Sequence, residues 1–280
     1  MKIAYQGEPG AFSEAASRLV SAEATLVPCK SFEDVFATVE QGPAGYGVLP
    51  IENSIGGSIH RNYDLLIENH LPIVGEVEGP VVHYLLALPG TSMAAIRRIY
   101  SHPQALAQCE RFLRTLTGVE IVATYDTAGS AKMVADGKLA DTAAIASARA
   151  GDIFGLSPLA SSIQDFDDNI TRFIVIGRRP LSDSAPDKTT IVFSLPNEPG
   201  SLFKALSAFA LRSVGLTKLE SRPIPGRPWE YLFYVDLAAS RDELPCQRAL
   251  GNLAEFAPML RTLGSYTSWK PPAQPLKVVS

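Results

Sequence analysis

The 280-residue sequence is poor in cysteine: it has three, Cys29, Cys109 and Cys246, far apart along the chain. An odd number of scattered thiols does not build a disulfide framework and is typical of reduced thiols in the cytoplasm. No CxxC, no HExxH and no closely spaced His–Cys pair occurs, so we expect no metal site. The composition therefore predicts a cytoplasmic protein without a structural metal.

Other signals are also missing. No run of about 18 apolar residues is present, which excludes a predicted membrane span. Neither GxGxxG nor GxxxxGK[ST] occurs, so we expect neither a dinucleotide nor ATP as cofactor. The net charge is −4 and there is no basic stripe, which argues against nucleic acid as a partner. The opening residues, MKIAYQG, predict a strand at once and leave no room for a signal or transit peptide.

With 46% hydrophobic residues, the chain can bury two cores. The segment RRPLSDSAPDK, at 178–188, is polar and carries two prolines between two apolar strand patterns, so we interpret it as a linker. The sequence thus predicts one domain over 1–180 and a second over 188–267.

The first region alternates short β-like runs with helical stretches. This pattern favours an α/β fold with largely parallel sheets, in which ligands bind at the carboxyl ends of the strands. We expect its helices at 10–21, 31–41, 58–69, 103–116, 127–136 and 147–154.

The second region predicts strand, helix, strand, strand, helix and strand, which is the ferredoxin-like βαββαβ order. Its first helix follows NEPGS and is apolar at 202, 203, 206, 209 and 210, a helical stripe.

Four strand-to-helix junctions in the first region carry Ser, Thr, Asn, His or Gly where a helix begins: 50–66, 100–110, 125–133 and 145–151. Such residues are ordinary helix caps. Several helix N-termini at one sheet edge can also form a cradle for an anion. Arg172 is the fixed cation expected near it, as a carboxylate clamp or as one member of a surface salt bridge with a neighbouring aspartate. Gly56-Gly57 marks either a turn or a close approach to a ligand.

Five motifs occur in order: YQGEPGAFSE, PIENSIGGSI, SHPQALAQC, YDTAGSA and NITRF. Together they resemble the prephenate dehydratase family. The region after the linker, including ESRP at 220–223, is similar to an ACT domain. The resemblance covers residues 2 to about 267.

The resemblance implies a two-lobed catalytic domain similar to periplasmic binding proteins, with lobes of about 1–78 with 165–180, and 79–164. It implies crossings between the lobes near 76–80 and 158–170. The implied activity is that of a carbon–oxygen lyase (EC 4.2.1.51), which converts prephenate to phenylpyruvate, CO2 and water in phenylalanine biosynthesis without a cofactor. The implied catalytic residues are Thr171, Arg172 and Phe173, and the implied substrate-binding residues are Asn53, Ser54, Ser101, Gln108, Asp126 and Thr127.

Our mechanistic hypothesis assigns the substrate carboxylates to Arg172 and to helix N-termini. Thr171 would donate a hydrogen bond to the departing hydroxyl. Asp126 stands where many relatives carry glutamate, so its role is open.

For the second domain, the resemblance implies feedback inhibition by L-phenylalanine and a homodimer or homotetramer. The effector would be bound by Asn197, Gly200, Ser201, Leu202, Glu220 and Ser221. Without the resemblance, Gly200 can be explained as a simple turn, and Glu220 and Arg222 as a pair of charged residues at the edge of a strand.

Two alternatives stay open. SIHRNYDLL and HPQALAQCE resemble the plant-type arogenate dehydratases, so the enzyme can act on arogenate or on both substrates. A non-catalytic amino-acid sensor with the same fold is the other alternative, against which the intact TRF sequence argues. No chorismate mutase segment is expected, so we predict a monofunctional enzyme.

Overall fold

The computed structural model describes residues 1–224 and 226–271. The chain forms two compact units, one of Met1–Leu65 with Val77–Ile174 and the other of Leu66–Glu76 with Val175–Ser280. The second unit thus includes two short segments that precede the expected linker. The domain boundaries 1–180 and 188–267 stay a prediction.

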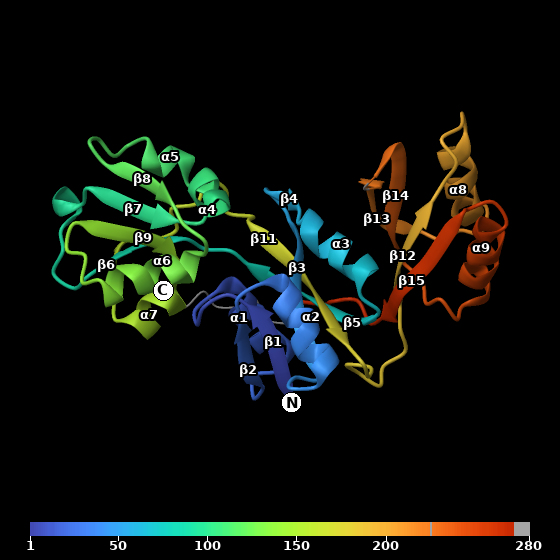
Figure 1. The fold of residues 1–280 in the computed structure, drawn as a ribbon, viewed down its shortest axis with the longest axis horizontal. Coiled ribbons are helices and arrows are strands. Elements are labelled where there is room, and N and C mark those ends of the chain that lie inside the picture. The colour runs from blue at the N-terminus through green and yellow to red at the C-terminus, as the bar shows by residue number, and fades with distance from the viewer. Residues whose placement is uncertain (225, 272–280) are drawn as a thin grey trace. The chain divides into compact units, whose positions relative to one another are not determined.

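The first sheet has the strand order β2-β1-β3-β11-β5, with β4 added at β3. β1 pairs in parallel with both β2 and β3. Helices α1 and α2 follow the first two strands directly, as the alternating pattern predicts (Figure 1). The elements of this part are β1 Lys2–Gln6, α1 Phe12–Val20, β2 Thr25–Cys29, α2 Phe32–Gln41, β3 Tyr46–Asn53, β4 Gly57–Ser58, α3 His60–Glu68, β5 Ile73–Pro80 and β11 Ile170–Gly177.

The second sheet lies wholly in the first unit and has the order β10-β6-β9-β7-β8. Its central strand β9 is buried on both faces, because Ala144 and Ala146 pack with α6 and α7 whereas Ala143 and Ile145 pack with α4. Figure 1 shows these helices on opposite sides of the sheet. The elements are β6 Tyr84–Ala87, η1 Met93–Ala95, β7 Arg98–Ser101, α4 Pro103–Gln108, α5 Glu110–Leu113, β8 Glu120–Ala123, α6 Thr127–Asp136, β9 Thr142–Ala146, α7 Ala148–Phe154 and β10 Ser157–Ala160.

The expectation of largely parallel sheets is right only for part of this second sheet. β7 is parallel to β8 and β9, but β6 is antiparallel to β9 and to β10. β6, the strand by which the chain enters this sheet, therefore runs against β7, β8 and β9, whereas β10, being antiparallel to β6, runs in the same direction as β9. The chain enters after β5, through 81–83, and leaves through 161–169. The first crossing was expected at 76–80, too early, because β5 continues to Pro80.

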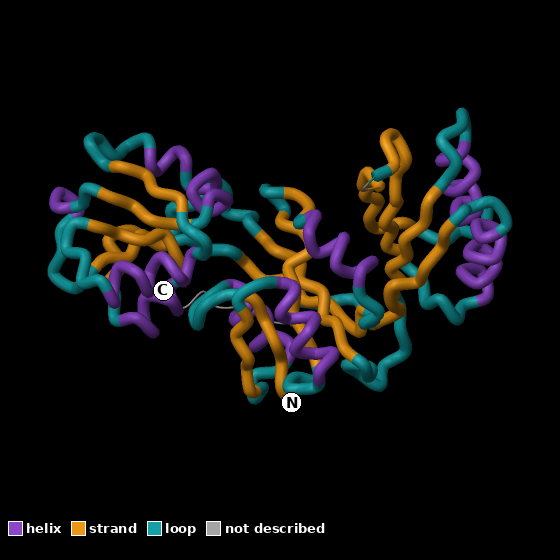
Figure 2. Tube along the Cα trace, viewed as in Figure 1, coloured by secondary structure: helices purple, strands orange, loops and turns teal. Residues whose placement is uncertain are grey.

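The second unit contains an antiparallel four-stranded sheet in the order β13-β14-β12-β15. Its elements confirm the predicted βαββαβ order (Figure 2). Phe193 and Val235 of the sheet and Phe209 and Leu253 of the helices share one core, so both helices cover the same face. The elements are β12 Lys188–Ser194, α8 Ser201–Ala210, β13 Leu216–Ile224, β14 Arg227–Leu237, α9 Leu244–Ala254 and β15 Met259–Tyr266.

A buried ion pair holds β5, through its residue Glu76, to this sheet. Lys188 Nζ donates to both carboxylate oxygens of Glu76, at 3.0 and 2.9 Å, and lies 3.9 Å from Asp236. The backbone N–H of Trp269 also donates to Glu76. The side chains of Lys188 and Glu76 are 11% and 3% exposed. The lysine therefore offsets two acidic groups that water scarcely reaches.

We predict that Lys188→Met lowers the free energy of unfolding by about 3–5 kcal/mol, because it leaves a buried carboxylate without its cation. Urea unfolding followed by circular dichroism measures this loss. The double variant Lys188→Met/Glu76→Gln should recover part of it. An unchanged unfolding midpoint in the single variant would show that the pair is not a net support of the fold.

Candidate active site

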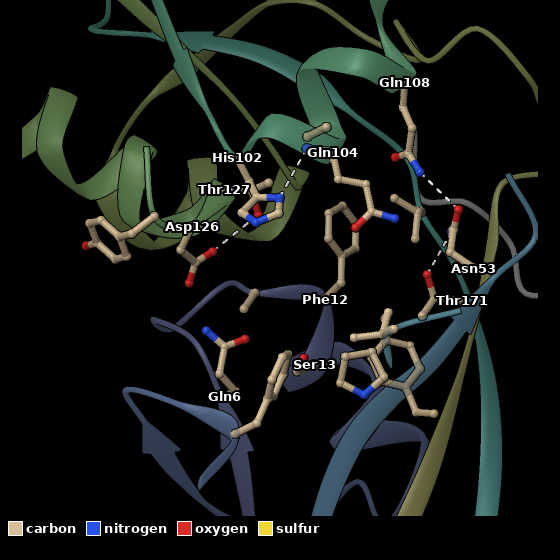
Figure 3. Close-up of a pocket in the computed structure, with 18 of the residues that line it drawn as sticks. Gln6, Phe12, Ser13, Asn53, His102, Gln104, Gln108, Asp126, Thr127 and Thr171 are labelled. Carbon is tan, nitrogen blue, oxygen red and sulfur yellow. Dashed lines mark hydrogen bonds between the residues drawn. The ribbon is translucent and has the colours of Figure 1, made fainter. Parts of the chain in front are cut away.

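The first unit contains a cavity of about 450 Å³. It is bounded by residues of both sheets and by the first turns of several helices (Figure 3). Its size is within the range typical of small-molecule sites. The lining residues are Gln6, Ala11, Phe12, Ser13, Ser31, Phe32, Glu33, Pro50, Asn53, Ile59, Val81, His83, His102, Gln104, Ala105, Gln108, Tyr125, Asp126, Thr127, Thr171 and Phe173.

Asn53, at the end of β3, is 3% exposed and its amide orientation is defined by its neighbours. Its Oδ1 accepts from the backbone N–H groups of Ile55 and Gly56, at 3.1 and 2.7 Å. Backbone N–H groups can only donate, so Oδ1 must face them. The Nδ2 group of Asn53 therefore faces Thr171 and donates to its Oγ1 at 2.9 Å.

This contact determines how the Thr171 hydroxyl can act. Oγ1 accepts from Asn53, and its own hydrogen has no acceptor among the described residues. Thr171 is 7% exposed and lines the cavity. Its hydroxyl is therefore arranged to donate a hydrogen bond to a bound molecule.

Gln108 and His83 hold Asn53 in place from the second lobe. Gln108 Nε2 donates to Asn53 Oδ1 at 3.0 Å, and Gln108 Oε1 lies 2.9 Å from His83 Nε2 and accepts from Asn169 at 3.1 Å. Since Oε1 is an acceptor, Nε2 of His83 carries the hydrogen. Nδ1 is then an acceptor, and it has no partner among the described residues. His83 thus orients the amide chain that ends at Thr171.

Burial lowers the pKa of His83 below its ordinary value, while the contact with Gln108 acts in the opposite direction. Below about pH 6.5 the unfolded chain takes up a proton at this histidine more readily than the folded protein does, because burial disfavours the charged imidazole. Stability is therefore expected to fall as the pH drops through this range. In His83→Gln, the unfolding midpoint should decline less steeply between about pH 7 and 5. Equal slopes in thermal unfolding of the two proteins would contradict this assignment.

Asp126 caps α6 at another part of the cavity wall. Its carboxylate accepts from the backbone N–H groups of Ala128, at 3.0 Å, and Glu8, at 3.1 Å. Thr127, the next residue, also lines the cavity. His102 caps α4 by accepting from the backbone N–H of Gln104, as expected of a histidine at a helix start in the 100–110 junction.

The three residues of the TRF sequence do not share one environment. Thr171 and Phe173 line the cavity, but Arg172 does not. Successive residues of a strand point to opposite faces, so Arg172 is directed away, and its guanidinium lies 3.9 Å from Glu52. The structure therefore does not bring the expected carboxylate clamp to the cavity.

Two of the expected substrate-binding serines support the backbone instead. Ser101 is fully buried and donates to the carbonyl of Ile145 at 2.7 Å. Ser54 donates to the carbonyl of Asp168 and accepts from the N–H of Ile170. Neither serine lines the cavity.

Of the four junctions expected to form an anion cradle, three contribute lining residues and the one at 145–151 does not. Ser147 of that junction donates to the carbonyl of Gly10, where a Cβ would come within 2.6 Å of Ala150. Gly56 likewise approaches a side chain, Gln104, and Gly57 forms the β3–β4 turn with φ 74°.

Sequence reasoning missed two further junctions that line the cavity. One is the turn from β1 into α1, which supplies Gln6, Phe12 and Ser13, and the other begins α2 at Ser31. The YQGEPGAFSE motif was a signal for the first of these. His83 was missed because it lies in a crossing segment with no helix-start pattern.

The charge of the cavity wall is acidic. Glu33 and Asp126 are its charged residues apart from the histidines, and no lysine or arginine of the described chain lines it. Arg61 donates to Glu33 at 2.8 Å, and this hydrogen bond lowers the pKa of Glu33. Residues 1–224 and 226–271 contain no cluster of three His, Cys, Asp or Glu side chains that could hold a metal ion, and no helix long and apolar enough to span a membrane.

A second, smaller cavity of about 110 Å³ lies in the second unit. Asn197, Ser201 and Leu202, at the start of α8, line it. Gly200 is the N-cap of this helix, with φ 84°, and does not line it. Glu220 and Ser221 lie on β13, also outside the lining, so the structure brings together three of the six expected effector residues.

A family model and a curated relative indicate the same family. A family model described as prephenate dehydratase matches residues 3–181. The Arabidopsis thaliana protein named arogenate dehydratase/prephenate dehydratase 6, chloroplastic, is 48% identical over 97% of this chain and 71% of its own length.

Two solved structures have a similar fold across the chain. Prephenate dehydratase from Arthrobacter aurescens, in complex with L-Phe, is 34% identical with a TM-score of 0.85, covering 95% of this chain and 90% of its own. A protein described as GqqA, a novel type of quorum quenching acylase, is 37% identical with a TM-score of 0.85, covering 96% and 98%. The chain belongs to the prephenate dehydratase family.

Proposed function

We propose that the larger cavity catalyses the decarboxylating dehydration of prephenate to phenylpyruvate. The observation that carries this proposal is the contact between Asn53 Nδ2 and Thr171 Oγ1, which leaves the threonine hydrogen directed to a bound molecule. Thr171 is also the family's essential threonine by resemblance. Gln108 and Asn53 serve as positioning residues in this account.

In the reaction, the bond from the ring to its hydroxyl oxygen breaks and the ring carboxylate leaves as CO2. The electron pair of the carbon–carbon bond enters the ring and makes it aromatic. The departing hydroxide takes up a proton and becomes water. A threonine hydroxyl is too weak an acid to supply this proton unaided, so Thr171 stabilises the developing charge by its hydrogen bond. Holding the substrate in one orientation can supply up to about 7–11 kcal/mol.

Arogenate is the second candidate substrate, and the acidic cavity wall favours it. Arogenate carries an ammonium group where prephenate carries a ketone. Asp126 lines the cavity with no lysine or arginine in that lining, whereas the charge of Glu33 is offset by Arg61. A carboxylate at such a wall attracts an ammonium group. The relative from Arabidopsis thaliana carries both activities in its name.

Parallel turnover assays of purified protein on prephenate and arogenate test the proposed function. We expect phenylpyruvate from prephenate or phenylalanine from arogenate, each with loss of CO2. A higher kcat/KM for arogenate would keep the site and reassign the substrate. No turnover of either compound by folded protein would contradict the proposal and revive the sensor hypothesis.

Because one structural neighbour is described as an acylase, we also asked whether this cavity could catalyse acyl transfer. Acyl transfer uses a nucleophile activated by an adjacent base. Within the described cavity lining, no serine or threonine hydroxyl is hydrogen-bonded to a histidine. We therefore do not propose acylase activity for this chain.

For the second unit we propose an ACT domain that binds L-phenylalanine and inhibits the enzyme. The bound L-Phe of the Arthrobacter aurescens structure supports this proposal. The cavity of about 110 Å³ is smaller than the roughly 300 Å³ typical of ligand sites. We therefore propose that the protein is a homodimer or homotetramer in which a second copy completes the phenylalanine site. We also propose that the enzyme is cytoplasmic. Phenylalanine that changed neither activity nor thermal stability would contradict this regulation.

A further inference from the structure

We propose that the N-terminus of α1 is the subsite for a substrate carboxylate, held by the backbone N–H groups of Phe12 and Ser13 and by the hydroxyl of Ser13. It takes the place of the cationic clamp expected at Arg172, which does not line the cavity. The identity of the anion rests on the proposed function.

The first donor group comprises two backbone amides. Gly10 and Ala11 before the helix have acceptors in Glu14 and Glu8. The N–H groups of Phe12 and Ser13 have none within the described chain. The N-cap residue Ala11 has no side chain that could accept from them, whereas Ser31 and Asp126 cap α2 and α6. α1 is therefore left uncapped, with these two amides on residues that line the cavity.

The second, independent observation is the side chain of Ser13. This residue is 7% exposed and lines the cavity, where Figure 3 shows it near Phe12. Its Oγ makes no hydrogen bond with any described residue. A hydroxyl on a cavity wall without a partner in the protein can donate to and accept from a bound molecule. A ligand oxygen at this position would satisfy both the hydroxyl and the amides.

The local charge also suits an anion at this helix. Glu14, the acidic residue in the first turn of α1, accepts from Gly10 and is paired with Arg149 at 2.8 Å. Its charge is therefore offset. The aligned peptide dipoles place about half a positive charge at a helix N-terminus. With Arg172 directed away, this helix end supplies the attraction that a carboxylate needs.

A pair of variants isolates the charge at the subsite. Ser13→Asp adds a negative charge. Ser13→Asn adds a side chain of nearly the same size as aspartate but without the charge. We expect Ser13→Asp to raise the KM for prephenate at least about 100-fold and Ser13→Asn about tenfold, since a hydrogen bond to a charged group contributes roughly this much. An acidic residue in the first turn stabilises a helix, so the melting temperature of Ser13→Asp should not fall.

Calorimetric binding of phenylpyruvate adds a readout that does not need turnover. Phenylpyruvate keeps only the side-chain carboxylate. If its Kd rises with the KM for prephenate, α1 holds that carboxylate; if only the KM for prephenate rises, α1 holds the ring carboxylate. Both results support the subsite. If the carboxylates were bound elsewhere, neither the KM nor the Kd would change in the Ser13 variants.

Equal KM and Kd values in the wild type and both variants would overturn the subsite and leave the proposed function standing. An inactive wild type would overturn the function. In that case, a Kd for phenylpyruvate that differs between the wild type and the Ser13 variants would still support the subsite. The same Kd in all three proteins, or no binding, would overturn the subsite as well as the function.

Discussion

Replacing Thr171 with valine is expected to lower kcat by about 10²–10³-fold, the loss typical of removing one hydrogen-bond donor that stabilises charge in the transition state. Valine keeps the shape of the side chain and removes the hydroxyl. Asn53 Nδ2 retains acceptors in Asn169, at 2.7 Å, and in the carbonyl of Ile170, at 3.2 Å. The variant should therefore fold and bind substrate almost as the wild type does.

Thr171→Ser is the matched control because it restores the hydroxyl without the methyl group. We expect it to recover a large part of the rate, at an unchanged melting temperature. Steady-state kinetics on the preferred substrate measures both variants. A valine variant with near-normal kcat would remove Thr171 from the chemistry.

Asn53→Asp is the second variant with a large expected effect. It replaces the donor Nδ2 with an oxygen that would face the oxygen atoms of Asn169, Ile170 and Thr171. The hydroxyl of Thr171 would turn to donate to the new carboxylate and would no longer serve the substrate. We expect a loss of kcat of at least about 100-fold. The unfolding free energy should also fall, by about 1–3 kcal/mol, because buried acceptors lose their donor.

Asn62→Asp is the control for stability. Asn62 is fully buried and its Nδ2 donates to the carbonyl of Pro50 at 2.6 Å, but its side chain does not line the cavity. We expect a similar loss of stability with kcat changed only a few-fold. If both variants lost activity in proportion to stability, Asn53 would have a structural role alone.

The fold was largely predictable because the local patterns agree with it. All six helices expected before the linker are present, with 103–116 divided into α4 and α5 at Cys109. β2 and β10 were missed because each is short and contains a proline, Pro28 or Pro158, which weakens a strand pattern. The grouping of 66–76 with the C-terminal unit depends on long-range contacts, including the pair of Lys188 with Glu76, that no local pattern reveals.

Those residues of the site that belong to recognisable motifs could be predicted, and the geometry of a strand could have corrected the position of Arg172. Asn53, Gln108, Asp126 and Thr171 came from motifs and do line the cavity. The position of Arg172 was open to correction from the sequence, because a strand that points Thr171 at the cavity must point its neighbour away. Ser13 lies in the YQGEPGAFSE motif, but its role could not be assigned from the sequence, since an uncapped helix and an unpartnered hydroxyl are visible only in three dimensions.

The most direct test of this account is a crystal structure of Thr171→Val with unreacted prephenate bound. We expect the ring hydroxyl of the substrate to point at residue 171, and one carboxylate to lie within hydrogen-bond distance of the amides of Phe12 and Ser13. A substrate bound with its hydroxyl away from residue 171 would contradict the central claim that Thr171 assists departure of the hydroxyl.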